Sequence, residues 1–279
     1  MSFIDWIQVI FYGIVEGITE WLPVSSTGHL ILFESFWPMD VSTEFLSMFR
    51  VVIQLGAILA VCVVFFERLN PFSRSHSLAQ KQVIWGIWGK VIVGCIPAGI
   101  LGILLDDFLD AHFYKWPVVA ATLIIYGIAF ILIENRNKRT RPSIRNFREM
   151  SYPMALMIGV FQLLSLIPGT SRSGSTILGA MLIGTSRTVA AEFSFFMAIP
   201  VMFGASLLKL VKYGFAFTAG ELTLLIIGMV SAFAVSLLVI RFLMEYIKKY
   251  SFKVFGYYRI VLGILVIVIA FLFPNLLPA

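Results

Sequence analysis

Two apolar stretches of this chain are each interrupted by a polar turn that contains Pro, Gly, Ser and Thr. Residues 9–36 read VIFYGIVEGITEWLPVSSTGHLILFESF, and residues 152–185 read YPMALMIGVFQLLSLIPGTSRSGSTILGAMLIGT. Such a break cannot face lipid, because the backbone groups that it frees would find no hydrogen-bond partner there. We therefore expect two re-entrant helix–turn–helix hairpins whose turns are buried in protein. The alternative is that each stretch forms kinked membrane spans.

The rest of the 279-residue sequence is typical of a helical membrane protein. Hydrophobic residues make up 59% and charged residues 13%, against about 45–50% and about 25% in soluble domains. This composition excludes an ordinary soluble enzyme and a disordered chain, and two cysteines exclude a disulfide scaffold. We expect a single all-α membrane domain, 1–279, in which six full transmembrane helices accompany the two hairpins. The six apolar segments, each near the ~20 residues that cross a bilayer, are 46–66, 89–105, 117–134, 190–211, 221–241 and 255–273.

The formal net charge of +6 indicates membrane topology and not nucleic-acid binding, because basic loops remain on the cytoplasmic side. The acidic segment 106–115 is therefore expected to form a solvated loop outside, and both termini are expected on the same side. Lys209 and Lys212 also fall outside, as an exception to the charge rule. The loops expected inside are 67–82, 135–148 and 241–253.

The two halves of the chain resemble one another at a shift of 146 residues. Because each half contains three full spans, the second half must be inverted relative to the first. Broken helices that meet near the bilayer midplane at such a repeat interface are typical binding sites. We place repeat one at about 1–134, the basic cytoplasmic loop at 135–150 and repeat two at about 151–279. The matching pairs are Gly13/Gly159, Glu16/Gln162, Ser25/Ser171, Thr27/Ser173, Gly28/Gly174 and Ile31/Ile177.

Ionisable residues within the apolar stretches are few and lie at or near the breaks. Glu16 and Glu20 share one helix face, His29 follows the first turn, and Arg172 lies in the second. A charge at the bilayer centre costs about 2.5–3.5 kcal/mol on insertion scales, so these groups should pair with one another, with a ligand or with a metal. A structural ion pair flanked by helix caps is the alternative.

Both breaks place hydroxyl groups at a helix N-terminus, which is an arrangement that binds anions. Arg172 can hold phosphate oxygens with two parallel hydrogen bonds, so we expect a phosphate or diphosphate ligand. The carboxylates of Glu16 and Glu20 would repel it, unless a divalent cation such as Mg²⁺ or Ca²⁺ bridges them or burial protonates one of them. The candidate phosphate-binding residues are Ser25, Thr27, Gly28, Thr170, Ser171, Ser173 and Gly174.

Three motifs resemble the signatures of the undecaprenyl-diphosphatase family, the bacitracin-resistance phosphatases of bacteria. They are Glu16-x-x-x-Glu20, PVSSTGH at 23–29 and PGTSRSG at 168–174, with VIQLGAILAV at 52–61 and EFSF at 192–195 also similar. The resemblance implies hydrolysis of undecaprenyl diphosphate to undecaprenyl phosphate and inorganic phosphate, which recycles the lipid carrier for peptidoglycan and other envelope polymers. It also implies a site open to the outer face of the plasma (inner) membrane. The catalytic residues that it implies are Glu16, Glu20, Ser26, His29 and Arg172.

Two mechanisms and one other function remain compatible with these residues, whereas a second class of phosphatase does not fit them. Ser26 could attack the terminal phosphorus with His29, three residues on, as its base, or a metal-activated water could attack while Ser26 only binds phosphate. A transporter or lipid flippase would share the broken helices. A phosphatase of the vanadium-haloperoxidase type would need a second embedded His, and His29 is the single one here. The sequence leaves open whether two copies form a homodimer.

Overall fold

The computed structural model describes residues 3–138, 140–214, 216–274 and 276–277, and all regular elements in this part of the chain are helices. One isolated parallel bridge joins Ile144 and Thr185. The expected all-α class is therefore confirmed. The helices are α1 (Phe3–Thr19), α2 (Ser26–Phe36), α3 (Thr43–Val52), α4 (Gln54–Val64), α5 (Phe66–Leu69), α6 (Leu78–Phe113), α7 (Trp116–Asn137), α8 (Tyr152–Leu163), η1 (Leu164–Leu166), α9 (Arg172–Leu182), α10 (Arg187–Tyr213), α11 (Ala219–Lys249) and α12 (Lys253–Leu272).

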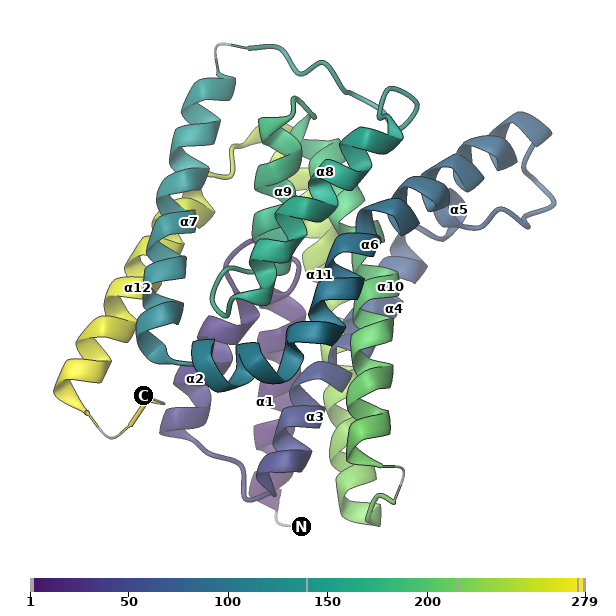
Figure 1. The fold of residues 1–279 in the computed structure, drawn as a ribbon. Helices are drawn as coiled ribbons and strands as arrows, with labels where there is room; N and C mark the ends of the chain where they lie inside the picture. Colours follow the sequence, from purple (N-terminus) through teal and green to yellow (C-terminus); the bar gives the residue numbers. More distant parts are fainter. Residues whose placement is uncertain (1–2, 139, 215, 275, 278–279) are drawn as a thin grey trace.

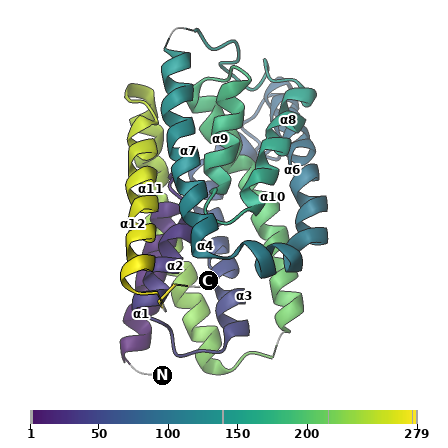
Figure 2. The ribbon, with the colours of Figure 1, turned by 60° about the vertical axis from the view of Figure 1, so that its left-hand side comes forward.

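Six of the described helical segments are long and apolar enough to cross a membrane, which confirms the six predicted spans. The first of them joins α3 and α4 into one segment, Thr43–Val64, with only Ile53 between the two helices. The other five are α6, α7, α10, α11 and α12. Figures 1 and 2 show the long helices running side by side in one bundle.

The two interrupted stretches form pairs of short helices. α1 and α2 have 17 and 11 residues, and α8 and α9 have 12 and 11, whereas a bilayer requires about 20. Figure 1 shows the α1–α2 turn approaching from the end of the bundle that holds the two termini, and the α8–α9 turn approaching from the opposite end. The turns meet at mid-height, where the Ser173 hydroxyl donates to the Glu20 carbonyl at 3.0 Å.

The segment 106–115, expected as an outer loop, is helical as far as Phe113, so that expectation is wrong for most of its length. α6 extends through it and ends beside α7. Pro97 lies inside α6, and a proline removes a helix hydrogen bond and bends the axis; Figure 1 shows α6 turning across the bundle before it reaches α7. The acidic side chains that suggested the loop lie outside the described side chains: Asp106, Asp107 and Asp110.

Glycines allow the central helices to approach closely, as is common between membrane helices. A Cβ on Gly13 of α1 would lie 2.6 Å from the Gly228 carbonyl oxygen of α11. A Cβ on Gly159 of α8 would lie 2.1 Å from the Gly94 carbonyl oxygen of α6. The two matched glycines of the sequence repeat therefore each allow a short helix to pack closely against a long one.

Gly56 and Gly204 provide a test of this close packing. A Cβ on Gly56 would lie 2.0 Å from the Met229 carbonyl oxygen, whereas no atom lies within 4 Å of a Cβ on Gly204. We expect Gly56→Ala to destabilise the protein by about 1–3 kcal/mol through overpacking. Gly204→Ala should be neutral or stabilising by up to about 1 kcal/mol through helix propensity. Thermal unfolding in detergent measures both; equal melting temperatures would contradict the packing at Gly56.

A candidate active site at the two helix breaks

Each break ends in a serine that caps the next helix with an unusual backbone conformation. Ser25 has φ 74° and accepts the Gly28 N–H at 3.3 Å, and Ser171 has φ 72° and accepts the Gly174 N–H at 3.1 Å. In the described residues these two serines are the non-glycine positions with positive φ. Strained backbone of this kind costs about 1–3 kcal/mol and clusters at functional sites.

Glu20 connects the two breaks. Its Oε1 accepts from Arg172 Nη2 at 3.0 Å and from Arg172 Nε at 3.3 Å, while its Oε2 accepts from Ser26 Oγ at 3.1 Å. All three side chains are largely buried. The structure therefore brings together three of the predicted catalytic residues from positions 152 residues apart in the chain.

Arg172 is held from its other side by α10. Its Nη1 donates to the Ser194 carbonyl at 2.7 Å, and its guanidinium lies 5.7 Å from the ring centroid of Trp21. The Ser194 hydroxyl lies 2.7 Å from the Thr176 hydroxyl. Ser194 and Thr176 thus orient the arginine, and the sequence reasoning did not assign them to the site. The family-like motif EFSF at 192–195 includes Ser194 and could have indicated that this serine belongs to the site.

His29 lies beside Ser26 in sequence but faces a different partner. Its Nε2 is 2.7 Å from the Tyr258 hydroxyl and its Nδ1 is 2.7 Å from the Ser25 carbonyl. Among the described contacts, no hydrogen bond joins His29 to the Ser26 hydroxyl, so the pair expected from their spacing does not form. The base within reach of Ser26 is the Glu20 carboxylate.

Several buried polar atoms around the breaks lack partners. Six of the eight such atoms in the described side chains belong to four residues at or next to the breaks: Glu16, Trp21, Thr170 and Gln162. Native proteins rarely leave buried polar groups unpaired. Both carboxylate oxygens of Glu16 are among them, although its side chain is 0% exposed. Unpaired atoms in this number are what a site for a polar ligand, an ion or water would leave.

A divalent cation is compatible with this donor set if substrate supplies most of its ligands. No cluster of three or more His, Cys, Asp or Glu side chains in the described residues could hold a metal by itself. Glu16 offers two unpaired carboxylate oxygens, whereas both Glu20 oxygens already accept hydrogen bonds. Mg²⁺ is commonly bound by one or two carboxylates together with substrate phosphates and water.

Some of the predicted phosphate-binding residues already use their polar groups to cap a helix, and others still have donors available for a ligand. The hydroxyls of Ser25 and Ser171 and the N–H groups of Gly28 and Gly174 are engaged in the two caps, and Ser173 donates to Glu20. The first two amides of α2 and of α9 have no acceptor within their own helix. Thr27 lies on the wall of a cavity, and the Thr170 hydroxyl is buried and unpaired.

A cavity of about 370 Å³ opens beside Ser26. Gln54 lies on its wall, and the cations Arg50 and Lys209 also line it. Lys209, which the sequence analysis noted as an exception to the rule that basic residues lie inside, thus has a place at the cavity. Arg50 forms a two-point ion pair with Glu34. Positive charge in a partly dehydrated cleft attracts anionic ligands.

Arg259 of α12 joins both breaks, and the sequence reasoning missed it. Its side chain is 0% exposed, and its guanidinium donates to the carbonyls of Pro23 at 3.2 Å and of Gly169 and Thr170 at 2.9 Å each. The ring centroid of Tyr126 lies 5.4 Å away. The sequence offered one signal for it: Arg259 lies within the apolar segment 255–273, and charges within spans are rare and functional.

Comparison with known proteins shows the family of the chain. The sequence profile of the family "Bacitracin resistance protein BacA" matches residues 9–265. The chain is 58% identical over 272 residues to an undecaprenyl-diphosphatase of Enterococcus faecalis, covering 96% of this chain and 98% of the relative. It is 57% identical over 267 residues to an undecaprenyl-diphosphatase of Lactiplantibacillus plantarum, covering 95% and 97%. The chain thus belongs to the bacitracin resistance protein BacA family.

Proposed function

We propose that this protein hydrolyses undecaprenyl diphosphate to undecaprenyl phosphate and inorganic phosphate, and thereby confers bacitracin resistance. Family membership and the names of its relatives support the reaction. The observation that carries it is the Ser26–Glu20–Arg172 network, in which Ser26 lines a cavity that two cations also line. A nucleophile, an acceptor for its proton and a phosphate-binding cation are the parts that phosphoryl transfer requires.

In the proposed reaction, Arg172 and the free amides at the starts of α2 and α9 neutralise the terminal phosphate. Ser26 Oγ attacks the terminal phosphorus and passes its proton to Glu20, which already accepts its hydrogen bond at 3.1 Å. The bond from phosphorus to the bridging oxygen breaks, and undecaprenyl phosphate leaves. Water then cleaves the phosphoserine. Direct attack by water, with Ser26 binding phosphate, is the second route.

His29 has a supporting role in this scheme. It contacts the Ser25 carbonyl and the Tyr258 hydroxyl, so its role is to fix the cap of α2. Glu20, and not His29, accepts the proton of Ser26. Its ring also stacks against Tyr258, with an interplanar angle of 9°. This assignment differs from the one expected from the Ser26–His29 spacing.

We further propose that Glu16, with Glu20, holds Mg²⁺ or Ca²⁺ in the substrate complex. The unpaired carboxylate of Glu16 supports a cation at this position. When bound, such a cation supplies positive charge to phosphate oxygens. The residues themselves provide carboxyl oxygens in a buried position, where they could act as ligands.

The proposed setting is the bacterial plasma membrane, with two opposed re-entrant hairpins in an inverted repeat and the site open to the outer face. The mirrored serine caps and the mirrored glycine contacts of α1 and α8 support the repeat. The described parts of the basic segments, 67–82, 135–138, 140–148 and 241–253, lie at the end of the bundle away from the termini in Figure 1. The lipid tail would lie along the surfaces of the membrane-spanning helices, within the bilayer.

A homodimer stays a prediction.

Ser26→Ala tests the proposal. We expect phosphate release from a long-chain polyprenyl diphosphate to fall by about 10³-fold, equivalent to about 4 kcal/mol in the barrier, because the nucleophile is lost. Ser35→Ala on the same helix is the control, since its hydroxyl donates only to the Ile31 carbonyl among the described contacts. Phosphoserine trapped on Ser26 would support covalent catalysis, and near-normal turnover by Ser26→Ala would select attack by water.

The transporter alternative gives a different result in the same assay. Folded parent protein that binds the lipid but releases no phosphate would overturn the hydrolase. Repeating the assay with a chelator tests the proposed cation separately, because chelation would remove the metal and leave the protein side chains in place. Full turnover with chelator present would contradict the cation.

A further inference from the structure

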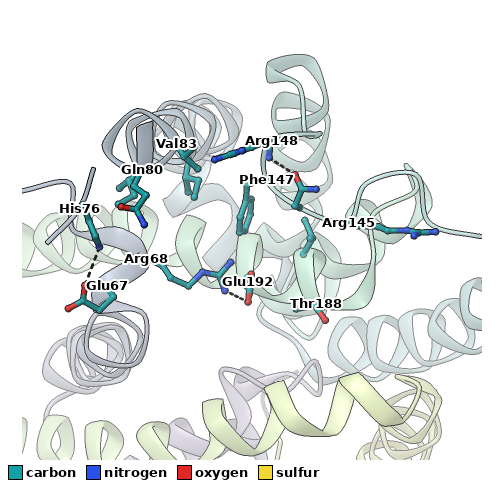
Figure 3. A pocket seen from close by; sticks show the side chains of 14 residues that line it. Glu67, Arg68, His76, Gln80, Val83, Arg145, Phe147, Arg148, Thr188 and Glu192 are labelled. Atoms are coloured by element: carbon teal, nitrogen blue, oxygen red, sulfur yellow. Dashed lines mark hydrogen bonds and ion pairs between the residues drawn. The ribbon is translucent and has the colours of Figure 1, made fainter. Parts of the chain in front are cut away.

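A second cavity lies at the other end of the bundle, among the basic segments. Its volume is about 660 Å³, larger than the cavity beside Ser26. The segment around α5, the start of α6, the loop 145–148 and the first turns of α10 enclose it. Figure 3 shows these four segments contributing side chains around one opening. None of the proposed catalytic residues lines it.

Two arginines present unused donors to this cavity. Arg68 forms an ion pair with the buried Glu192 through Nη1 alone, which leaves its Nε and Nη2 without a partner in the described contacts. The guanidinium of Arg148 has no described partner. In Figure 3 Arg148 extends toward Val83 at one edge of the opening, Arg68 lies across Phe147 from it beside Glu192, and Arg145 points away.

The acidic side chains of the cavity already have partners. Glu192 is paired with Arg68, and Glu67 lies 3.2 Å from His76 Nε2. The other ring nitrogen of His76 is buried without a partner. Among all the residues that line the cavity, three arginines stand against the two glutamates, so the lining carries an excess of positive charge. Such a site favours an anion over a metal cation.

The loop that carries Arg148 is folded in advance of any ligand. Asn146 Oδ1 accepts the Arg148 N–H at 3.0 Å, and the Glu149 carboxylate accepts the Arg145 N–H at 2.5 Å and Asn146 Nδ2 at 2.6 Å. These bonds hold the pKa of Glu149 below its ordinary value. Lys90 reaches from α6 to the Phe147 carbonyl at 2.6 Å and ties the loop to the bundle. A preformed loop binds with a smaller entropy loss.

The remaining wall of the cavity is apolar. Val83, Ile84 and Ile87 of α6 line one side, with Phe147 and Val189 also in the lining. A free ion would leave these side chains uncovered. An amphiphilic ligand would contact them with its glycerol and first methylene groups while its phosphate met Arg68 and Arg148. Basic pockets between membrane helices commonly bind anionic lipid head groups.

We propose that this cavity binds the phosphate group of an anionic phospholipid from the leaflet at the basic end of the protein. Arg148 and the free edge of Arg68 donate to the phosphate oxygens, in the planar geometry that guanidinium offers. Phe147 lies under Arg68, 5.8 Å from its guanidinium carbon, and fixes its orientation. The site is separate from the proposed catalytic centre.

Native mass spectrometry of the full-length protein in detergent tests this site. Phosphatidylglycerol and phosphatidylcholine with the same acyl chains are titrated in parallel. We expect tighter binding of phosphatidylglycerol, and a fall of about fivefold in that affinity for Arg148→Gln. Arg148→Lys should recover part of it. Arg74→Gln is the matched control, because Arg74 is exposed and does not line the cavity.

The outcomes separate the lipid, free phosphate and general surface charge. An equal fall in Arg148→Gln and Arg74→Gln, or no preference for phosphatidylglycerol, would overturn the lipid site. A parallel arm measures the melting temperature with inorganic phosphate; a shift that depends on Arg148, without lipid preference, would assign the site to free phosphate and also overturn the lipid. Phosphate release by Arg148→Gln should equal the parent, so the result does not depend on the proposed hydrolysis.

Discussion

Glu20→Gln should lower kcat for phosphate release by about 10²–10⁴-fold, the range that general base catalysis contributes. Gln has nearly the same shape as Glu but cannot take the Ser26 proton. It also leaves the Arg172 charge without its carboxylate, which now lies 3.0 Å away. Initial rates at saturating polyprenyl diphosphate measure the effect on kcat. A fall in the apparent affinity alone would contradict the role of Glu20 as proton acceptor.

Glu134→Gln is the control for the loss of a buried ion pair. Glu134 is 0% exposed, pairs with Arg187 at 2.5 Å and accepts the Phe252 N–H at 2.9 Å. It lies on α7 away from the breaks, so its neutralisation should lower the melting temperature and leave kcat of the folded fraction near the parent value. If both variants lost turnover equally, the loss would be one of folding and not of catalysis.

Arg259→Met should destabilise the protein strongly. The carbonyls of Pro23, Gly169 and Thr170 have no other described donor, and each buried carbonyl left unpaired costs about 1–3 kcal/mol. Both breaks would loosen together, because Arg259 contacts both. We expect a large fall in melting temperature and little active protein. Thermal unfolding in detergent measures the effect.

Arg259→Lys separates positioning from folding. The lysine ammonium group retains the positive charge, but it cannot donate to all three carbonyls as the larger, planar guanidinium does. We expect a smaller fall in melting temperature and a fall in kcat of about 10–100-fold, as displacement of catalytic groups by about 1 Å produces. Arg241→Lys on the exposed face of α11 is the matched control. Unchanged kcat in Arg259→Lys would show that Arg259 only stabilises the fold.

The sequence was sufficient for the spans, the two breaks and the pairing of charges. Long apolar segments cannot be accommodated in water, and a polar turn within them cannot face lipid, so 9–36 and 152–185 had to be buried breaks. The cost of isolated charges predicted that Glu20 and Arg172 would find partners, and they pair with each other at 3.0 Å. These conclusions depend only on which residues are present and on where apolar, polar and charged residues follow one another along the chain.

The tertiary structure alone decided which partner each polar group has. Spacing along one helix brings Ser26 and His29 near each other, yet Glu20 accepts from Ser26 and His29 meets Tyr258, 229 residues away. The position of Arg259 between the breaks and of Lys209 at the cavity also depends on how distant helices pack. A hydrogen bond requires a separation of about 3 Å, and such a separation between distant segments is set by side-chain packing and not by sequence spacing.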